Sequence, residues 1–79
     1  MKIILKRQAE KYLENAPIDV QEKLLKAIED IKEFRGDIKK LADGSRRYKI
    51  YHYRIIFTAD RQKEEITITE INTRGNIKY

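Results

Sequence analysis

The apolar residues in the first half of the chain recur at helical spacing. One set predicts a helix over residues 6–15, and a longer set predicts a second helix that begins at Pro17 and extends to about Phe34. Pro17 is suited to a first helical turn, where its missing N–H costs nothing. A stripe of this kind is normally buried, so we expect a helical hairpin packed on one face of a sheet. The second stripe consists of Val20, Leu24, Ile28, Ile31 and Phe34, widened by Leu25 and Ala27.

The remaining segments alternate apolar and polar residues, as strands do. Residues 2–5 predict a short first strand, residues 46–57 predict a β-hairpin with Tyr51-His52 at its tip, and residues 65–71 predict a further strand. The apolar phase slips between Ile68 and Ile71, which indicates a β-bulge or a strand end. Residues 38–41 are expected to be a connector.

The two strands of the predicted hairpin separate their side chains into two sets. Tyr48 and Ile50 point one way, whereas Arg47, Lys49 and Tyr51 point the other way. On the second strand Tyr53, Ile55 and Phe57 lie on the apolar face. Arg54 lies on the opposite face, together with the cations of the first strand. The cations therefore converge on the outer face of one sheet. Such a surface suits a phosphate backbone and unstacked bases, although a solvated basic face has the same pattern.

Length and composition narrow the alternatives. The 79 residues predict one α+β domain, residues 1–79, with the order β-α-α-β-β-β and a small, mainly antiparallel sheet. The chain has no cysteine and one histidine, so no typical metal site is expected, and no apolar run reaches the length of a membrane span. A cytoplasmic protein is the simplest inference.

The charge is basic and unevenly distributed. The formal net charge is +5, which favours nucleic acid or an acidic protein as partner. Within residues 38–57 a single acidic residue, Asp43, stands against six basic ones. These are Lys39, Lys40, Arg46, Arg47, Lys49 and Arg54. The positive field is thus expected to peak at the hairpin.

The order of the elements and the short motifs within them resemble the RelE/ParE superfamily of toxins from bacterial and archaeal toxin–antitoxin modules. The resemblance covers essentially the full length, and it depends on order and spacing because each piece is short. The matching pieces are Pro17, Asp37-Ile38-Lys39-Lys40-Leu41, Arg47-Tyr48-Lys49-Ile50, Tyr53-Arg54-Ile55-Ile56-Phe57 and Ile71-Asn72-Thr73-Arg74-Gly75-Asn76-Ile77.

The resemblance implies a single RelE-like toxin domain with one of two activities. Toxins of the RelE branch are ribosome-dependent messenger RNA endonucleases, in which the 2′-hydroxyl of the RNA attacks the adjacent phosphate without a metal or another cofactor, and translation stops. Toxins of the ParE branch inhibit DNA gyrase and lack the full basic cluster. The basic residues named below favour the endonuclease, and a ParE-like gyrase inhibitor without nuclease activity is the alternative.

The resemblance also assigns roles to individual residues. Arg54 and Arg74 are expected to clamp phosphate, because the planar guanidinium matches it bidentately. Arg47 and Lys49 fall on the two basic strand positions of the family. Tyr79 is the candidate for the C-terminal tyrosine of the family and for a catalytic role. A further set is predicted to bind RNA, namely Arg46, Tyr51, Lys39 and Lys40.

Two departures from the family pattern concern the site. Tyr51-His52 replaces a turn of Gly-Asp type, and a lone histidine at a hairpin tip is more typical of an exposed turn residue than of an acid or base. Lys78 stands where the C-terminal tyrosine of the family most often falls, so that Tyr79 lies one position later. The implied partners are a cognate antitoxin, which is small, acidic and partly disordered, together with the ribosome and messenger RNA; no membrane is involved.

Overall fold

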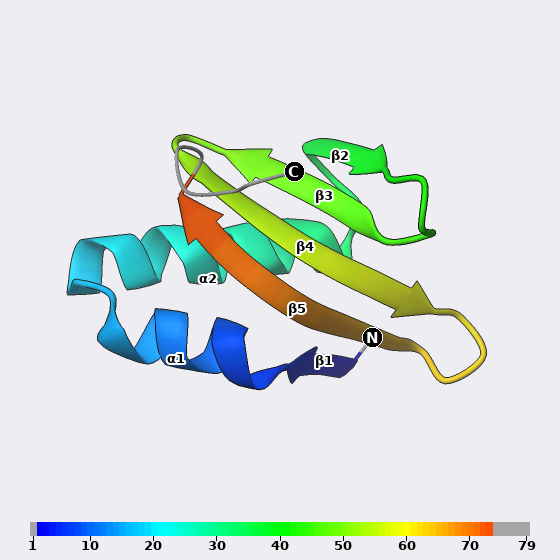
Figure 1. The fold of residues 1–79 in the computed structure, drawn as a ribbon, viewed down its shortest axis with the longest axis horizontal. Helices are drawn as coiled ribbons and strands as arrows, with labels where there is room; N and C mark the ends of the chain where they lie inside the picture. Colours follow the sequence, from blue (N-terminus) through cyan, green and yellow to red (C-terminus); the bar gives the residue numbers. More distant parts are fainter. Residues whose placement is uncertain (1, 74–79) are drawn as a thin grey trace.

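The computed structural model of the protein describes residues 2–73. Two helices, α1 (Arg7–Asn15) and α2 (Ile18–Lys32), lie on one face of a five-stranded sheet (Figure 1). The strand order is β1-β5-β4-β3-β2, in which β1 is parallel to β5 and all other neighbours are antiparallel. The strands are β1 (Lys2–Leu5), β2 (Asp37–Lys40), β3 (Arg46–Ile50), β4 (Tyr53–Asp60) and β5 (Glu65–Thr73).

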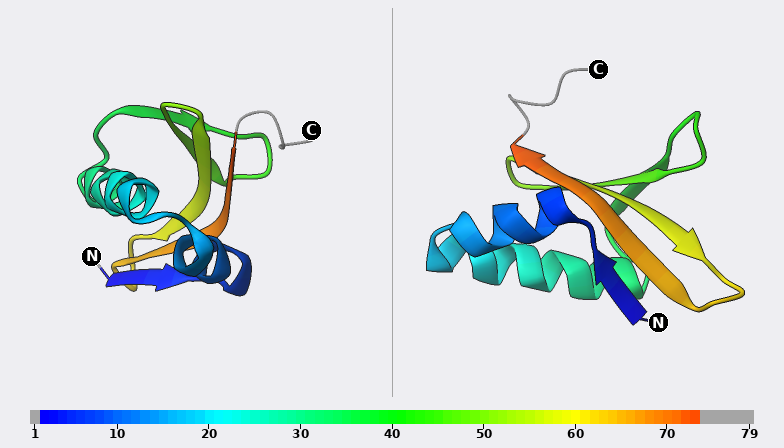
Figure 2. Two further views of the ribbon diagram at one scale, coloured as in Figure 1. Left: turned by 90° about the vertical axis from the view of Figure 1, so that its left-hand side faces the viewer. Right: turned by 60° about the horizontal axis from the view of Figure 1, so that its bottom comes forward.

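This architecture confirms the predicted α+β fold with a helical hairpin on one face of a mainly antiparallel sheet. The two views in Figure 2 show that no helix within residues 2–73 covers the opposite face. One element was not expected. The segment that was predicted to be a connector forms β2, with Ile38 opposite Tyr48 of β3. Three of the four residues of β2 are charged, which is compatible with an edge strand but resembles a loop in sequence.

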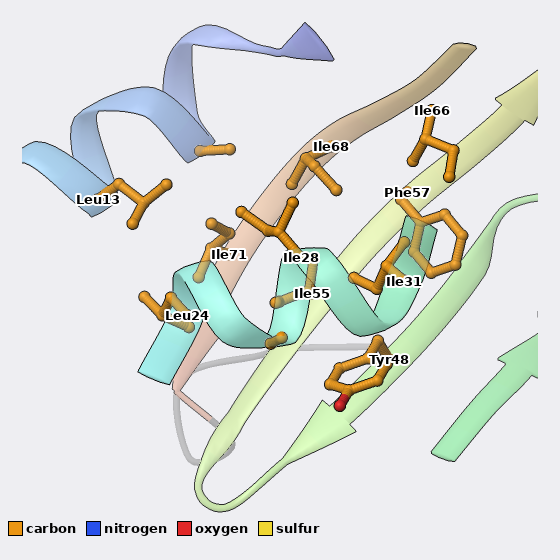
Figure 3. Close-up of a cluster of buried hydrophobic side chains, with 12 residues drawn as sticks. Leu13, Leu24, Ile28, Ile31, Tyr48, Ile55, Phe57, Ile66, Ile68 and Ile71 are labelled. Carbon is orange, nitrogen blue, oxygen red and sulfur yellow. The ribbon is translucent and has the colours of Figure 1, made fainter. Parts of the chain in front are cut away.

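The core lies between the helices and the inner face of β3, β4 and β5 (Figure 3). Leu24, Ile28 and Ile31 of α2 supply the helical side of it, as their spacing predicts. The stripe is narrower than expected, because Leu25 is 54% exposed and Phe34, which follows the helix, is 39% exposed. The strands contribute Tyr48, Ile55, Phe57, Ile66, Ile68 and Ile71.

A β-bulge in β5 explains the slip in the apolar phase. Ile56 pairs with Glu70 and Phe57 pairs with Ile68, so Thr69 is the additional residue. The Thr69 hydroxyl donates a hydrogen bond of 3.1 Å to the carbonyl of Ile56. Beyond the bulge the alternation is reversed: Ile71 points into the core, and its neighbours Glu70 and Asn72 point to the outer face.

Gln8 of α1 closes the free edge of β5. The parallel pairing with β1 ends near Ile68, where the chain turns into α1. In the first turn of α1, the Gln8 side-chain amide donates to the carbonyl of Ile71 and accepts from its N–H, both at 2.8 Å. The side chain thus replaces the backbone of a neighbouring strand and satisfies both polar groups of a buried residue.

Tyr48 links the sheet to α2 through its hydroxyl, which donates a hydrogen bond of 3.0 Å to Asp30 Oδ2. Burial, followed by the hydrogen bond and the charge of Asp30, raises the pKa of Tyr48 to about 12. The ring passes closely over Gly36, where a Cβ atom would lie 2.7 Å from Tyr48 Cε2 and where φ is +95°. Both the space and the backbone conformation therefore require glycine at this position.

Neither helix of the described chain has the length and apolar character needed to cross a membrane.

Replacing Gln8 with alanine should lower the free energy of unfolding. The change removes both bonds to Ile71, and we expect a loss of roughly 1–2 kcal/mol, since a net hydrogen bond is worth about 0.5–1.5 kcal/mol. Denaturant titration of the two proteins measures this difference. Gln62→Ala, in the exposed turn between β4 and β5, is the control and should stay within about 0.5 kcal/mol of the parent. Equal losses in both variants would show that Gln8 is not a clamp.

Tyr48 should make the protein less stable at alkaline pH. Its raised pKa means that the unfolded chain releases the hydroxyl proton near pH 10 while the folded chain retains it to about pH 12. This contribution is fully present below pH 10 and is lost as the pH rises through that window, by up to about 1.4 kcal/mol per pH unit. Denaturation at several pH values compares the parent with Tyr48→Phe, whose stability should fall less steeply. Parallel curves would contradict the assignment.

Candidate nucleic-acid interface

Three of the predicted catalytic cations lie on the outer face of the sheet. Arg47 and Lys49 of β3 alternate with buried Tyr48, and Arg54 of β4 precedes buried Ile55, so all three point away from the helices. Lys49 lies directly opposite Arg54 across the β3–β4 pair. Like charges in that position destabilise a sheet. Asp37 of β2 lies opposite Lys49 on its other side and offsets part of this repulsion.

The Arg47 side chain is held in place and largely covered. It is 19% exposed, and its Nη2 atom lies 3.9 Å from Oδ1 of Asp37 on β2. Its Nε atom is buried and has no hydrogen-bond partner among residues 2–73. A buried donor of this kind costs roughly 1–3 kcal/mol. This cost is consistent with a site arranged for an acceptor that comes from outside the described chain.

The outer face continues onto β5 with two residues that sequence reasoning missed. Asn72 lies opposite Arg54, and Glu70 lies opposite Ile56. The Asn72 amide donates a hydrogen bond of 2.6 Å to Glu70 Oε1. The signal for both residues is the slipped phase of β5, because a strand that contains one additional residue turns its later polar side chains outward.

The predicted RNA-binding lysines and Arg46 do not form one surface. Lys39 is exposed on the outer side, opposite Arg47. Lys40 and Arg46 are paired with each other, and Arg46 lies opposite the buried Phe57, which places both on the helical side of the sheet. The Arg46 guanidinium lies 5.7 Å from the centre of the Phe34 ring. Of these three residues, Lys39 alone extends the outer basic face.

Tyr51 is the residue that simple alternation misplaces. It has φ of +52° at the hairpin tip, and its exposed ring is on the side of α2, where Lys23 Nζ lies 5.2 Å from the ring centre. The expectation that Tyr51 shares a face with Arg47 and Lys49 is therefore wrong. The physical reason is the left-handed backbone, which ends the regular alternation before this residue. His52 is exposed beside it in the turn.

Arg74 and Tyr79, the two C-terminal candidates, lie outside the described residues. No group of three histidine, cysteine, aspartate or glutamate side chains within residues 2–73 is arranged to hold a metal ion.

A groove of about 570 Å³ opens on the helical side of the molecule, between the α1–α2 connection and the start of β4. Burial raises the pKa of the Tyr12 hydroxyl, and the nearby Tyr53 hydroxyl adds to the effect. No carboxylate lines the groove within the described chain. Its wall is apolar and aromatic, with an amide-rich rim and one cation; the lining residues are Tyr12, Ala16, Pro17, Val20, Tyr53, Gln8, Lys11 and Asn15.

Solved structures provide the comparison for this arrangement. A chain of the archaeal RelE–RelB complex from Pyrococcus horikoshii OT3 superimposes with a TM-score of 0.77 at 22% identity, covering 96% of this chain and 97% of that one. The chain has the RelE fold. A chain of the RelBE2 toxin–antitoxin complex from Mycobacterium tuberculosis superimposes with a TM-score of 0.78 at 15% identity, covering 92% and 96%. No family model and no curated protein matches the sequence.

Proposed function

We propose that the protein is the toxin of a type II toxin–antitoxin module and that it acts as a ribosome-dependent messenger RNA endonuclease. The observation that carries the proposal is the cluster of Arg47, Lys49 and Arg54 on the open face of a RelE fold. The fold alone would not distinguish a nuclease from an inhibitor of gyrase, because function depends on the site and not on the scaffold. The cations are the part of the site that suits phosphate chemistry.

The proposed reaction is cleavage of the RNA by its own 2′-hydroxyl. The oxygen attacks the adjacent phosphorus, and the pentacoordinate transition state carries additional negative charge on its oxygens. Arg54 and Lys49, held opposite each other on two strands, stabilise that charge without a rearrangement when the substrate arrives. Arg47 fixes the backbone of the message beside them. Arg74 and Tyr79 complete the predicted catalytic set, and the reaction takes place on ribosomes in the cytoplasm.

The proposed partner that holds the toxin inactive is a small, acidic, partly disordered antitoxin. The groove beside Tyr12 and Tyr53 supports this proposal, because it combines an apolar wall with Lys11 and no carboxylate in the described lining. An antitoxin segment with apolar and acidic side chains complements such a groove and folds as it binds. The outer basic face remains the surface for ribosome and message.

Arg54→Ala should abolish toxicity while the protein still folds and still binds the antitoxin. Removal of one preorganised contact to transition-state charge typically costs roughly 3–4 kcal/mol, or about 10²–10³ in rate. Cleavage of messages on programmed ribosomes measures the effect. Arg61→Ala, which removes the same charge from the exposed β4–β5 turn, is the matched control and should cleave at the parent rate. Parent-like cleavage by Arg54→Ala would exclude this residue from the catalytic set.

The same assays separate the proposal from the alternative. Induced expression of a ribosome-dependent nuclease should stop protein synthesis promptly and leave cut messages. A gyrase inhibitor should instead leave messages intact and provoke a DNA-damage response. Intact messages with a DNA-damage response, together with purified protein that is inactive on programmed ribosomes, would refute the endonuclease and support the ParE-like function.

Charge reversal at the rim of the groove should weaken the complex with the antitoxin. Lys11→Glu places a carboxylate against the acidic segment, and we expect the affinity to fall about tenfold, which corresponds to about 1.4 kcal/mol. Titration calorimetry with the cognate antitoxin measures the change. Lys26→Glu, on the exposed side of α2, alters the net charge equally and should bind as the parent does. Equal losses in the two variants would point to net charge alone, and no loss would exclude the groove.

A further inference from the structure

The basic face contains one carboxylate in an unexpected place. Glu70 is exposed on β5, next to Ile56 and on the diagonal from Arg54, which puts the two backbones roughly 7–8 Å apart. Asp37, which is also on this face, lies beside Arg47 at the edge of the sheet, and Asp60 and Glu65 pair at the far end of β4 and β5. A negative charge so close to the proposed phosphate clamp repels a nucleic acid, so its presence calls for a chemical explanation.

The carboxylate is also held in position by a chain of amides. Asn72 donates to Glu70 Oε1 at 2.6 Å, and Gln8 Nε2 lies 3.3 Å from Asn72 Oδ1. The same Gln8 amide is clamped to the backbone of Ile71. A glutamate that merely balanced charge on the surface would need no such chain. A base that is oriented by a second group, itself oriented by a third, is the arrangement found around activated nucleophiles.

The proposed reaction needs one component that the cations do not supply in the roles given to them above. The 2′-hydroxyl must lose a proton as it attacks, and an arginine remains protonated and cannot accept it. A lysine accepts a proton only in its neutral form, in which it no longer stabilises the charge on the phosphate. A carboxylate can accept the proton. Glu70 lies on the same face as Arg54 and Lys49, within the reach of long side chains, and its strand is paired with β4 at this point. It is therefore positioned beside the phosphate that those cations would hold.

We propose that Glu70 is the general base of the cleavage reaction, with Asn72 and Gln8 as positioning residues; this inference rests on the proposed endonuclease function. Glu70 takes the proton of the 2′-hydroxyl while the O2′–P bond forms and the P–O5′ bond breaks. The leaving 5′-oxygen takes a proton from water, and the proton on Glu70 returns to the solvent. The products are a 2′,3′-cyclic phosphate and a 5′-hydroxyl, and no other reactant is consumed.

The first test is Glu70→Gln, which keeps the shape of the side chain and an oxygen for the Asn72 amide. Loss of a general base should slow single-turnover cleavage on programmed ribosomes by about 10²–10⁴-fold. Ribosome affinity should stay the same or increase, because a repulsive charge has been removed. Glu65→Gln, at the far end of the same face of β5, is the matched control and should cleave at the parent rate. The melting temperatures should agree within about 4 °C.

Two further measurements distinguish chemistry from structure. The parent rate should fall at acidic pH as the base takes a proton, and this limb of the pH–rate profile should be absent from Glu70→Gln. Asn72→Ala should lower kcat about tenfold and leave KM unchanged, since it loosens the base without removing a phosphate contact. If Glu70→Gln folds poorly, the pH–rate profile of the parent protein alone tests the proposal. A parent rate that does not fall at acidic pH would overturn it.

The outcomes separate this inference from the function on which it rests. Cleavage by Glu70→Gln at the parent rate, with Arg54→Ala inactive, would refute the role of Glu70 and leave the endonuclease intact. A parent protein that does not cleave programmed messages would remove both proposals together. Inactive Glu70→Gln with parent-like affinity, an active Glu65→Gln and a lost acidic limb is the result that we expect.

Discussion

The burial of one face of the sheet beneath two short helices is the constraint on which the rest of this structure depends. The buried inward positions on the central strands are all apolar, because a domain of this size has few buried side chains to lose. Ile55, Phe57 and Ile68 meet that requirement. The opposite face is released from it and carries charge instead. The separation of a core from a charged surface is thus a direct result of the two-residue repeat of a strand.

The cations on the outer face are supported by what lies on the inner face. Arg54 stands between two strand neighbours and next to Ile55, which is completely buried, so its backbone cannot shift without disturbing the core. Tyr48 does the same for its neighbours Arg47 and Lys49 through the hydrogen bond to Asp30. Rigidity of this kind suits a surface that must present charge before the ligand arrives.

Much of the fold and part of the site could be predicted from the sequence. Apolar residues recur regularly in the two helices and in the β3–β4 hairpin. In the hairpin this spacing predicts that Arg47, Lys49 and Arg54 lie on one face. Strand β2 was missed because it is short and charged. The orientation of Tyr51 was missed because alternation holds only while φ stays negative. Gln8 could not be recognised, since its partner Ile71 lies 63 positions away and an exposed helical glutamine has many equivalent roles.

The bulge at Thr69 has a consequence for how this sequence can change over time. Because side chains alternate with a period of two, one residue gained or lost within a strand normally reverses the faces of all the residues after it. Thr69 is the exception, because it is the additional residue that has no pairing partner on β4. Its deletion would remove the bulge and leave Glu70 and Asn72 on the outer face and Ile71 in the core. A change of length in β5 is therefore tolerated at the bulge, whereas an insertion or deletion elsewhere in the strand would exchange two whole surfaces at once.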